Sequence, residues 1–390
     1  MRFRREVLDV VESPMVQLAT MAEAMPGSLK LCYGESDMPT PRFICDAASA
    51  AMAAGHTFYT HTAGCPGLRE AIAAKIAELH GVTYRPSEVM ATLGASMAIF
   101  VAIRAHVGPG DNAVVISPAY AIFSNAVILC GGEPRAVPLA RRGAGFALDV
   151  DRVRRAIDGG TRMLIVNSPS NPTGWVITAD EQRALCELAD RYDLTVLADE
   201  VYERLVFGAE IAPSFARLPP ARDRVIVVNS FSKTYNMTGW RLGWAQGSER
   251  AIQLMYQAAE FMTSNPASMI QQAGIAALRE GEDYVRGLRT HYAARRAQVV
   301  DALSEVPGVS LPDPQGAFYA FPGIEGLTDS ARFAVDLLRE TGVALAPGAG
   351  FGVSGEGYLR LCFAATEQTL SQALRRVREY LLARPTHAVN

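Results

Sequence analysis

The sequence predicts an α/β fold: a three-layer domain built on a mostly parallel β-sheet, joined to a smaller α+β domain. From about residue 45 to 278, short β-rich runs alternate with stretches of helical periodicity, which is typical of βαβ units. After residue 278 the pattern changes to one long charged helix and then to strands interrupted by Pro and Gly. We therefore expect a large domain over 45–278, a small domain over 279–390, and an N-terminal segment over 1–44 that packs with the small domain.

The expected strands are short apolar runs that end at turn residues. They cover residues 88–92, 113–117, 163–167, 194–199, 225–230 and 242–246. A helix is predicted over 178–192, because Thr178 can cap its N-terminus and Glu181 follows three residues later as a capping box. Further helices are predicted over 97–107, 282–303 and 366–383.

The composition is that of an ordinary globular protein and disfavours some partners. The 390 residues, 49% of them hydrophobic, suit about two domains. A formal net charge of -3 provides no basic field for nucleic acid or an anionic membrane. Residues 112–132 carry no charge, but Pro, Ser, Asn and Gly interrupt them, so strand, turn and helix is a better interpretation than a membrane span.

The six cysteines are scattered along the chain. They form no C-x-x-C pair and do not cluster with histidine, so we expect neither a disulfide framework nor a metal site. The first residues carry positive charge but no apolar block follows them, unlike a signal peptide. A cytoplasmic protein is the expectation from these features.

The most informative segment is 230–243, in which Lys233 stands between Ser232 and Thr234. It directly follows the apolar run 225–229, which predicts a buried parallel strand. Open α/β sheets bind their ligands at the carboxyl ends of the strands, so we expect Lys233 in a ligand site. There its amine can form a Schiff base with an aldehyde, whereas the competing interpretation is a solvated surface lysine.

With its neighbours, this segment resembles the lysine motif of the class I/II aminotransferases, the fold type I enzymes that use pyridoxal 5'-phosphate (PLP). The likeness runs in order through Gly34, Tyr59, Gly94-Ala95-Ser96, Tyr120, Asn171-Pro172-Thr173-Gly174, Asp199-Glu200-Val201-Tyr202, the lysine segment and Arg360-Leu361-Cys362-Phe363-Ala364. The resemblance implies a PLP-dependent aminotransferase that acts on an L-amino acid and a 2-oxo acid. A PLP-dependent lyase, cyclase or decarboxylase on the same fold is the alternative. A non-catalytic PLP-sensing module is disfavoured, because no basic helix-turn-helix precedes the fold.

The resemblance also implies roles around the cofactor ring. Lys233 would hold PLP as a Schiff base and move a proton as general acid and base. Asp199 would pair with the pyridine nitrogen. Tyr202 would hydrogen-bond the ring oxygen and, together with Asn171, keep the pKa of the Schiff base low. Tyr120 would stack on the ring. The competing interpretations are a helix cap for Asp199, a turn for Asn171 and a core position for Tyr120.

For the phosphate, the resemblance points to a helix start and to side chains near the lysine. Ala95 and Ser96 would open a helix whose N–H groups bind the phosphate. Ser230, Ser232 and Arg241 would add hydroxyls and a cation. Tyr59 would reach the phosphate of the other subunit, which implies a homodimer with shared active sites.

For the substrate, the resemblance points to Arg360. One arginine interrupts a strand-like apolar alternation there and needs a partner. That partner would be the substrate's α-carboxylate, with the backbone of Gly34 close by and Asn171 as a further substrate-binding residue. The alternative is a structural ion pair. In the aspartate-specific branch an arginine precedes a Ser-Asn-Pro segment by four residues, and Glu260 stands at that place here. This departure disfavours a dicarboxylate held in that way and leaves open whether Glu260 contacts substrate.

Overall fold

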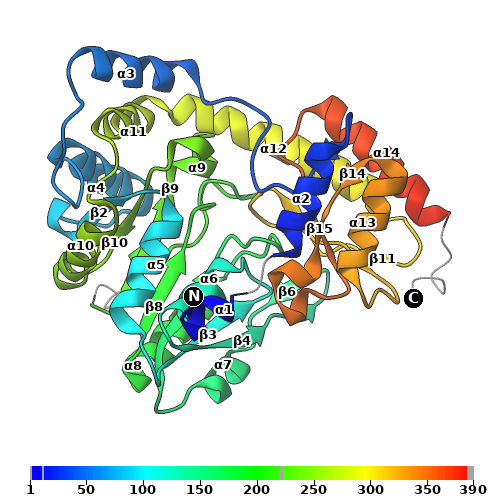
Figure 1. The fold of residues 1–390 in the computed structure, drawn as a ribbon, viewed down its shortest axis with the longest axis horizontal. Coiled ribbons are helices and arrows are strands. Elements are labelled where there is room, and N and C mark those ends of the chain that lie inside the picture. The colour runs from blue at the N-terminus through cyan, green and yellow to red at the C-terminus, as the bar shows by residue number, and fades with distance from the viewer. Residues whose placement is uncertain (1, 11–12, 219–222, 384–390) are drawn as a thin grey trace.

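A seven-stranded sheet forms the centre of the molecule in the computed structural model, which describes residues 2–10, 13–218 and 223–383 (Figure 1). Its strand order is β2-β10-β9-β8-β7-β3-β4. The strands are β2 (Val89–Thr92), β3 (Asn112–Ser117), β4 (Glu133–Pro138), β7 (Thr161–Asn167), β8 (Thr195–Asp199), β9 (Val225–Ser230) and β10 (Gly243–Gln246). All pairings are parallel except those of β10 with β2 and β9. The prediction of a mostly parallel sheet is confirmed.

The six predicted strands all occur, with ends that shift by at most two residues. Strand β4 was not among the predicted strands, and its two prolines and charged residues are unusual for a strand. As the last strand in the order, β4 has an open edge, where a proline that donates no hydrogen bond is tolerated.

Helices cover both faces of this sheet. They are α3 (Arg42–Ala53), α4 (Pro66–His80), α5 (Ala95–His106), α6 (Ile122–Leu129), α7 (Val150–Ala156), α8 (Ala179–Tyr192), α10 (Glu249–Thr263) and α11 (Ser268–Glu280). Alternate strand residues point to opposite sides: Val196 packs into the core cluster that contains Leu185 of α8, whereas Leu197 packs into the one that contains Ile103 of α5. The result is a helix–sheet–helix sandwich with two cores.

The second part of the molecule combines both ends of the chain (Figure 1). From the C-terminal side come α12 (Glu282–Leu303), β11 (Val309–Ser310), β12 (Tyr319–Ala320), β13 (Gly323–Ile324), α13 (Ser330–Thr341), β14 (Val343–Ala344), β15 (Ala346–Pro347), β16 (Leu359–Cys362) and α14 (Glu367–Leu382). From the N-terminal side come α1 (Arg5–Leu8), α2 (Pro14–Ala24) and β1 (Leu29–Lys30). Strand β1 pairs in parallel with β14, and Leu18 and Ala22 of α2 share a core with Leu337 of α13.

These shared contacts support the division that we propose, with residues 1–44 packing on a small domain over 279–390 and a large domain over 45–278. The two parts meet where Tyr202 and Leu205, just beyond β8, join the core of the small domain. The remaining short elements are a hairpin of β5 (Ala140–Arg142) and β6 (Gly145–Ala147), helix α9 (Phe231–Thr234), and single-turn helices at Pro86–Glu88, Phe215–Arg217, Thr238–Trp240, Gly348–Phe351 and Val353–Gly355.

Local sequence explains where helices α8 and α5 begin. The predicted capping box is present, since the Glu181 N–H donates to Thr178 Oγ1 at 3.2 Å and the Thr178 N–H donates to Glu181 Oε2 at 2.8 Å. The predicted helix over 97–107 begins earlier, at Ala95, because Gly94 adopts the left-handed φ of +75° that starts it. No helix among the described residues combines the length and the apolar character needed to cross a membrane.

Candidate active site

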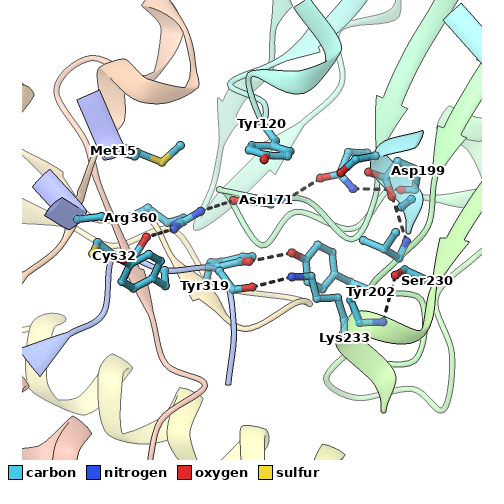
Figure 2. Close-up of a pocket in the computed structure, with 18 of the residues that line it drawn as sticks. Met15, Cys32, Tyr120, Asn171, Asp199, Tyr202, Ser230, Lys233, Tyr319 and Arg360 are labelled. Carbon is cyan, nitrogen blue, oxygen red and sulfur yellow. Dashed lines mark hydrogen bonds between the residues drawn. The ribbon is translucent and has the colours of Figure 1, made fainter. Parts of the chain in front are cut away.

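A cavity of about 540 Å³ opens at the carboxyl ends of the central strands, against the small domain (Figure 2). Every residue predicted for the site lines it except Tyr59: Gly34, Ala95, Ser96, Tyr120, Asn171, Asp199, Tyr202, Ser230, Ser232, Lys233, Arg241 and Arg360. These residues come from widely separated parts of the chain. The fold therefore brings the predicted set together at one sheet edge, where parallel α/β sheets bind ligands.

Lys233 lies on the one-turn helix α9, which starts immediately after β9. Ser230 caps this turn by accepting a hydrogen bond from the Ser232 N–H at 3.1 Å. The Lys233 ammonium donates to the Gly34 carbonyl at 2.6 Å and has no carboxylate within salt-bridge distance among the described residues. Burial lowers the pKa of Lys233 to about 8. The amine is therefore close to the neutral form that attacks an aldehyde.

Asp199 is the last residue of β8 and is buried. The Val201 N–H donates to its Oδ1 at 3.2 Å, and no cation forms an ion pair with it in the described part of the chain. Burial raises the pKa of Asp199 to about 7, while the Val201 hydrogen bond and the Lys233 charge act in the opposite direction. The carboxylate would therefore gain from a cationic partner placed in the cavity.

Tyr202 shares a hydrogen bond of 2.8 Å with the hydroxyl of Tyr319 on β12. Burial raises the pKa of Tyr202 well above its usual value, and the Tyr319 hydroxyl adds to the effect. A Cβ atom added to Gly34 would lie 2.7 Å from the Tyr319 hydroxyl, so only glycine fits beside this pair. Tyr319 was not predicted as a site residue, because it stands in the apolar run 317–321, a pattern that indicates a core position.

Arg360 lies on β16 and is buried between aromatic rings. Its guanidinium carbon is 4.7 Å from the ring centroid of Tyr319 and 5.0 Å from that of Phe351. One terminal nitrogen donates to Asn171 Oδ1 at 3.0 Å and the other to the Cys32 carbonyl. Its Nε is buried and finds no hydrogen-bond partner in the described part of the chain.

All acceptors of Arg360 in the described residues are thus neutral, and the competing structural ion pair is absent from them. A buried guanidinium costs free energy unless an anion neutralises it. The geometry leaves this cation for a carboxylate that comes from outside the protein, where a planar guanidinium can bind both oxygens.

The N-terminus of α5 and Arg241 also line the cavity. A Cβ atom on Gly94 would lie 2.4 Å from a terminal nitrogen of Arg241, so glycine lets the guanidinium lie against the helix start. Arg241 is held there by donating to the Thr238 carbonyl at 2.8 Å. Ala95 and Ser96 are the first residues of α5, and the first N–H groups of a helix have no acceptor within the helix. Together with this cation they suit a phosphate.

The two remaining tyrosines have different positions. Tyr120 lines the cavity and is 42% exposed, so its alternative interpretation as a core residue is wrong. Tyr59 is 89% exposed and lies outside the cavity of its own chain. Its predicted role at the phosphate of another subunit stays a prediction.

The cavity also has a wall that the sequence analysis did not predict. It comes from α2 and from the segment just before Gly34: Met15, Val16, Ala19, Thr20, Glu23, Cys32 and Tyr33. The sequence does contain a signal for the start of α2, because Ser13 followed by Pro14 is a helix-start pattern. It contains no local signal that α2 lies beside the site, since that position depends on the pairing of β1 with β14.

These residues fit PLP. A lysine with a lowered pKa, a buried carboxylate without a cation, and a glycine-lined helix start against Arg241 correspond to the aldehyde, the ring nitrogen and the phosphate of the cofactor. Among the described residues, no group of three or more His, Cys, Asp or Glu side chains could hold a metal ion.

Comparison with known proteins agrees with this geometry. Residues 26–377 match the family described as aminotransferase class I and II. The chain is 34% identical to an aspartate aminotransferase of Geobacillus stearothermophilus, covering 98% of this chain and 100% of that protein. It is also 34% identical to aromatic-amino-acid aminotransferase 2 of Thermococcus litoralis, covering 95% of each.

A solved structure, N-succinyldiaminopimelate aminotransferase from Mycobacterium tuberculosis, superposes with a TM-score of 0.92 at 34% identity, covering 97% of this chain and 100% of that one. These relatives are aminotransferases, which favours transamination over the lyase, cyclase or decarboxylase alternative. The chain therefore belongs to the class I and II aminotransferase family and is a PLP-dependent aminotransferase of fold type I.

Proposed function

We propose that this enzyme transfers an amino group from an L-amino acid to a 2-oxo acid, with Lys233 as the residue that binds PLP and moves the proton at the substrate's Cα. The observation that carries this proposal is the Lys233 amine, which is desolvated just beyond the end of β9 and, among the described residues, donates its hydrogen bond to the Gly34 carbonyl rather than to a carboxylate. Bound PLP supplies an aldehyde and an electron-withdrawing ring that stabilises negative charge at Cα.

Arg360 binds the α-carboxylate of the substrate in this proposal. Hydrogen bonds to Asn171 and to the Cys32 carbonyl orient its guanidinium, and the rings of Tyr319 and Phe351 pack close to it. With the carboxylate fixed there, the amine and Cα of the substrate extend toward Lys233. The Lys233 amine can then act as a general base that removes the Cα proton, and afterwards as a general acid that donates a proton.

Asp199 and the Tyr202–Tyr319 pair tune the cofactor in this proposal. A carboxylate next to the pyridine nitrogen favours the protonated ring, which is the stronger electron sink. The Tyr202 hydroxyl, held by Tyr319 at 2.8 Å, would donate to the ring oxygen. Ala95, Ser96, Ser230, Ser232 and Arg241 would hold the phosphate, and Tyr120 would cover the ring face.

We further propose a homodimer in which Tyr59 of each chain completes the phosphate site of the other. Phe58, Tyr59 and Phe261 are 81%, 89% and 89% exposed, an unusual concentration of exposed aromatic rings. The loop that carries Phe58 and Tyr59 is held in place, because Ser268 Oγ donates to the His56 carbonyl at 2.6 Å and Gln271 Nε2 donates to Thr60 Oγ1 at 2.9 Å, while Phe261 lies on α10. An ordered apolar surface of this kind supports an interface between subunits.

We also propose a cytoplasmic location and no nucleic-acid or membrane partner. All six cysteines are free thiols in the structure, which suits a reducing compartment. The net charge of -3 supports the absence of polyanionic partners.

The test of the catalytic proposal is Lys233→Ala with Lys233→Arg as the charge-retaining control. Neither substitution leaves a nucleophilic amine, so both should lose amino transfer by orders of magnitude while retaining the fold. Absorbance measures how far an amino acid converts bound PLP from its aldehyde form to its amine form. The oxo acid that is released is quantified in parallel. Near-wild-type conversion by either variant would assign the chemistry to another residue.

Covalent capture of PLP by the apoprotein should depend on pH through Lys233. Because burial lowers its pKa to about 8, the reactive neutral amine should increase as pH rises through 8 and level off above about 9. The unfolded chain, with an ordinary lysine, binds more protons between about pH 8 and 10, so the unfolding free energy should also rise across that window. Timed borohydride reduction and peptide mass analysis measure the capture. A rate that keeps rising beyond pH 10 would contradict the lowered pKa.

Arg360→Ala should weaken substrate binding by about 3 kcal/mol, roughly a hundredfold, because a buried charge-assisted pair is lost. Arg360→Lys should recover only part of this, since an ammonium cannot bind both carboxylate oxygens in one plane. Binding of an unreactive carboxylic acid to the PLP-loaded enzyme, measured by calorimetry, reports the effect. Arg191→Ala, at an exposed site on α8, is the control. Unchanged affinity in Arg360→Ala would mean that the arginine is structural.

Phe261→Lys should dissociate the dimer, because it places a charge in a desolvated interface, with an expected loss of about 2 kcal/mol or more. The dissociated subunits should also retain less PLP, because Tyr59 would no longer reach the phosphate site of the other chain. Analytical ultracentrifugation measures the mass, and Leu382→Lys, which changes an exposed leucine on α14, serves as control. Equal masses for the two variants would place the interface elsewhere.

A further inference from the structure

One wall of the cavity contributes no side chain to the roles proposed above. It consists of Met15, Val16, Ala19, Thr20 and Glu23 from α2, with Cys32 and Tyr33, and is called the α2 wall below. Figure 2 shows Met15 on the Arg360 side of the cavity, away from Asp199. A substrate whose carboxylate lies at Arg360 and whose amine lies near Lys233 leaves this wall for its side chain.

The part of the α2 wall nearest Arg360 is apolar and well fixed. The Ser13 hydroxyl caps α2 by accepting from the Met15 N–H at 3.3 Å. The Met15 side chain packs against Gly350, where an added Cβ would lie 3.0 Å from Met15 Cγ. Ala19 and Cys32 add small side chains that leave room. Burial raises the pKa of the Cys32 thiol, so it stays uncharged.

The charges around the cavity disfavour a second carboxylate on the substrate. Its basic lining residues in the described chain are Lys233, Arg241 and Arg360, and each already has an anionic or covalent partner in the proposed function. The α2 wall contributes only an anion, Glu23. Tyr33 donates a hydrogen bond to the Glu23 carboxylate, which raises the pKa of Tyr33 to about 12. Glu23 forms no ion pair among the described residues.

We propose that the α2 wall selects amino donors with an uncharged, apolar side chain, such as methionine, leucine or phenylalanine, and discriminates against aspartate and glutamate. The inference rests on the proposed function. A distal carboxylate would lose hydration against Met15 and Ala19 without gaining a cation, and it would approach Glu23. A distal ammonium would lose hydration against the same residues and would find Glu23 already bonded to Tyr33. An apolar side chain has no charge to dehydrate there, and its burial against the α2 wall is favourable.

The first experiment compares donors in the half-reaction of the purified PLP-loaded enzyme. We expect kcat/KM for methionine, leucine or phenylalanine to exceed that for aspartate and glutamate by at least tenfold. Calorimetry provides a readout independent of turnover, with 4-methylpentanoate and glutarate as unreactive acids of matched length. The monocarboxylate should bind at least tenfold more tightly.

Two substitutions assign this preference to the α2 wall. Met15→Lys adds a cation and should raise the aspartate-to-methionine ratio of kcat/KM by at least tenfold. Glu23→Gln removes the anion and should raise the same ratio severalfold. The matched controls lie outside the cavity: Leu382→Lys adds a cation on α14, and Glu187→Gln removes an exposed anion on α8. Both controls should leave the ratio unchanged.

The outcomes separate this inference from the proposed function. Amino transfer that is fastest with aspartate, glutamate or lysine would overturn the inference and leave the proposed function intact. A ratio that moves in neither Met15→Lys nor Glu23→Gln would show that the α2 wall does not meet the donor side chain, and would also overturn it. Absence of transfer from every donor, in a protein that binds PLP, would overturn both.

Discussion

The hydrogen bond from the Lys233 ammonium to the Gly34 carbonyl joins the two parts of the molecule at the point where the chemistry occurs. One partner belongs to the edge of the central sheet and the other to the N-terminal segment, which is bound to the small domain through β1 and β14. The Tyr202–Tyr319 contact makes a second connection of the same kind. The cavity exists because the two parts are held together across it, so its shape depends on the packing of both.

Charge balance is the second constraint on this site. Three basic side chains line the cavity, and the described residues give none of them a carboxylate partner within it. Neutral acceptors, aromatic rings and a backbone carbonyl orient these cations without neutralising them. Burying these cations without anions costs free energy, and binding anions beside them recovers it. The site therefore suits a phosphate and a carboxylate together. The lowered pKa of Lys233 and the raised pKa of Asp199 follow from the same desolvation.

Sequence reasoning worked best where a local pattern and a structural rule agreed. Asp199 and Lys233 each follow a continuous apolar run, and parallel strands bring their carboxyl ends to one edge. It failed where the local pattern was ambiguous. Tyr319 lies in an apolar run that suits a core, and β4 contains two prolines that suit a turn. The resemblance to a family supplied the roles of Asn171, Tyr120 and Arg360, which no spacing or periodicity could have assigned.

The sequence by itself determined the class of fold, the strand ends that present Lys233 and Asp199, and the family, because these depend on short-range periodicity and on motifs in a fixed order. Only the tertiary structure decided that α2 faces the cavity, that Tyr319 reaches Tyr202, and that Arg360 has neutral neighbours. Each of these depends on contacts between residues more than a hundred positions apart in the chain. Such contacts follow from how the two parts pack, which local sequence does not encode.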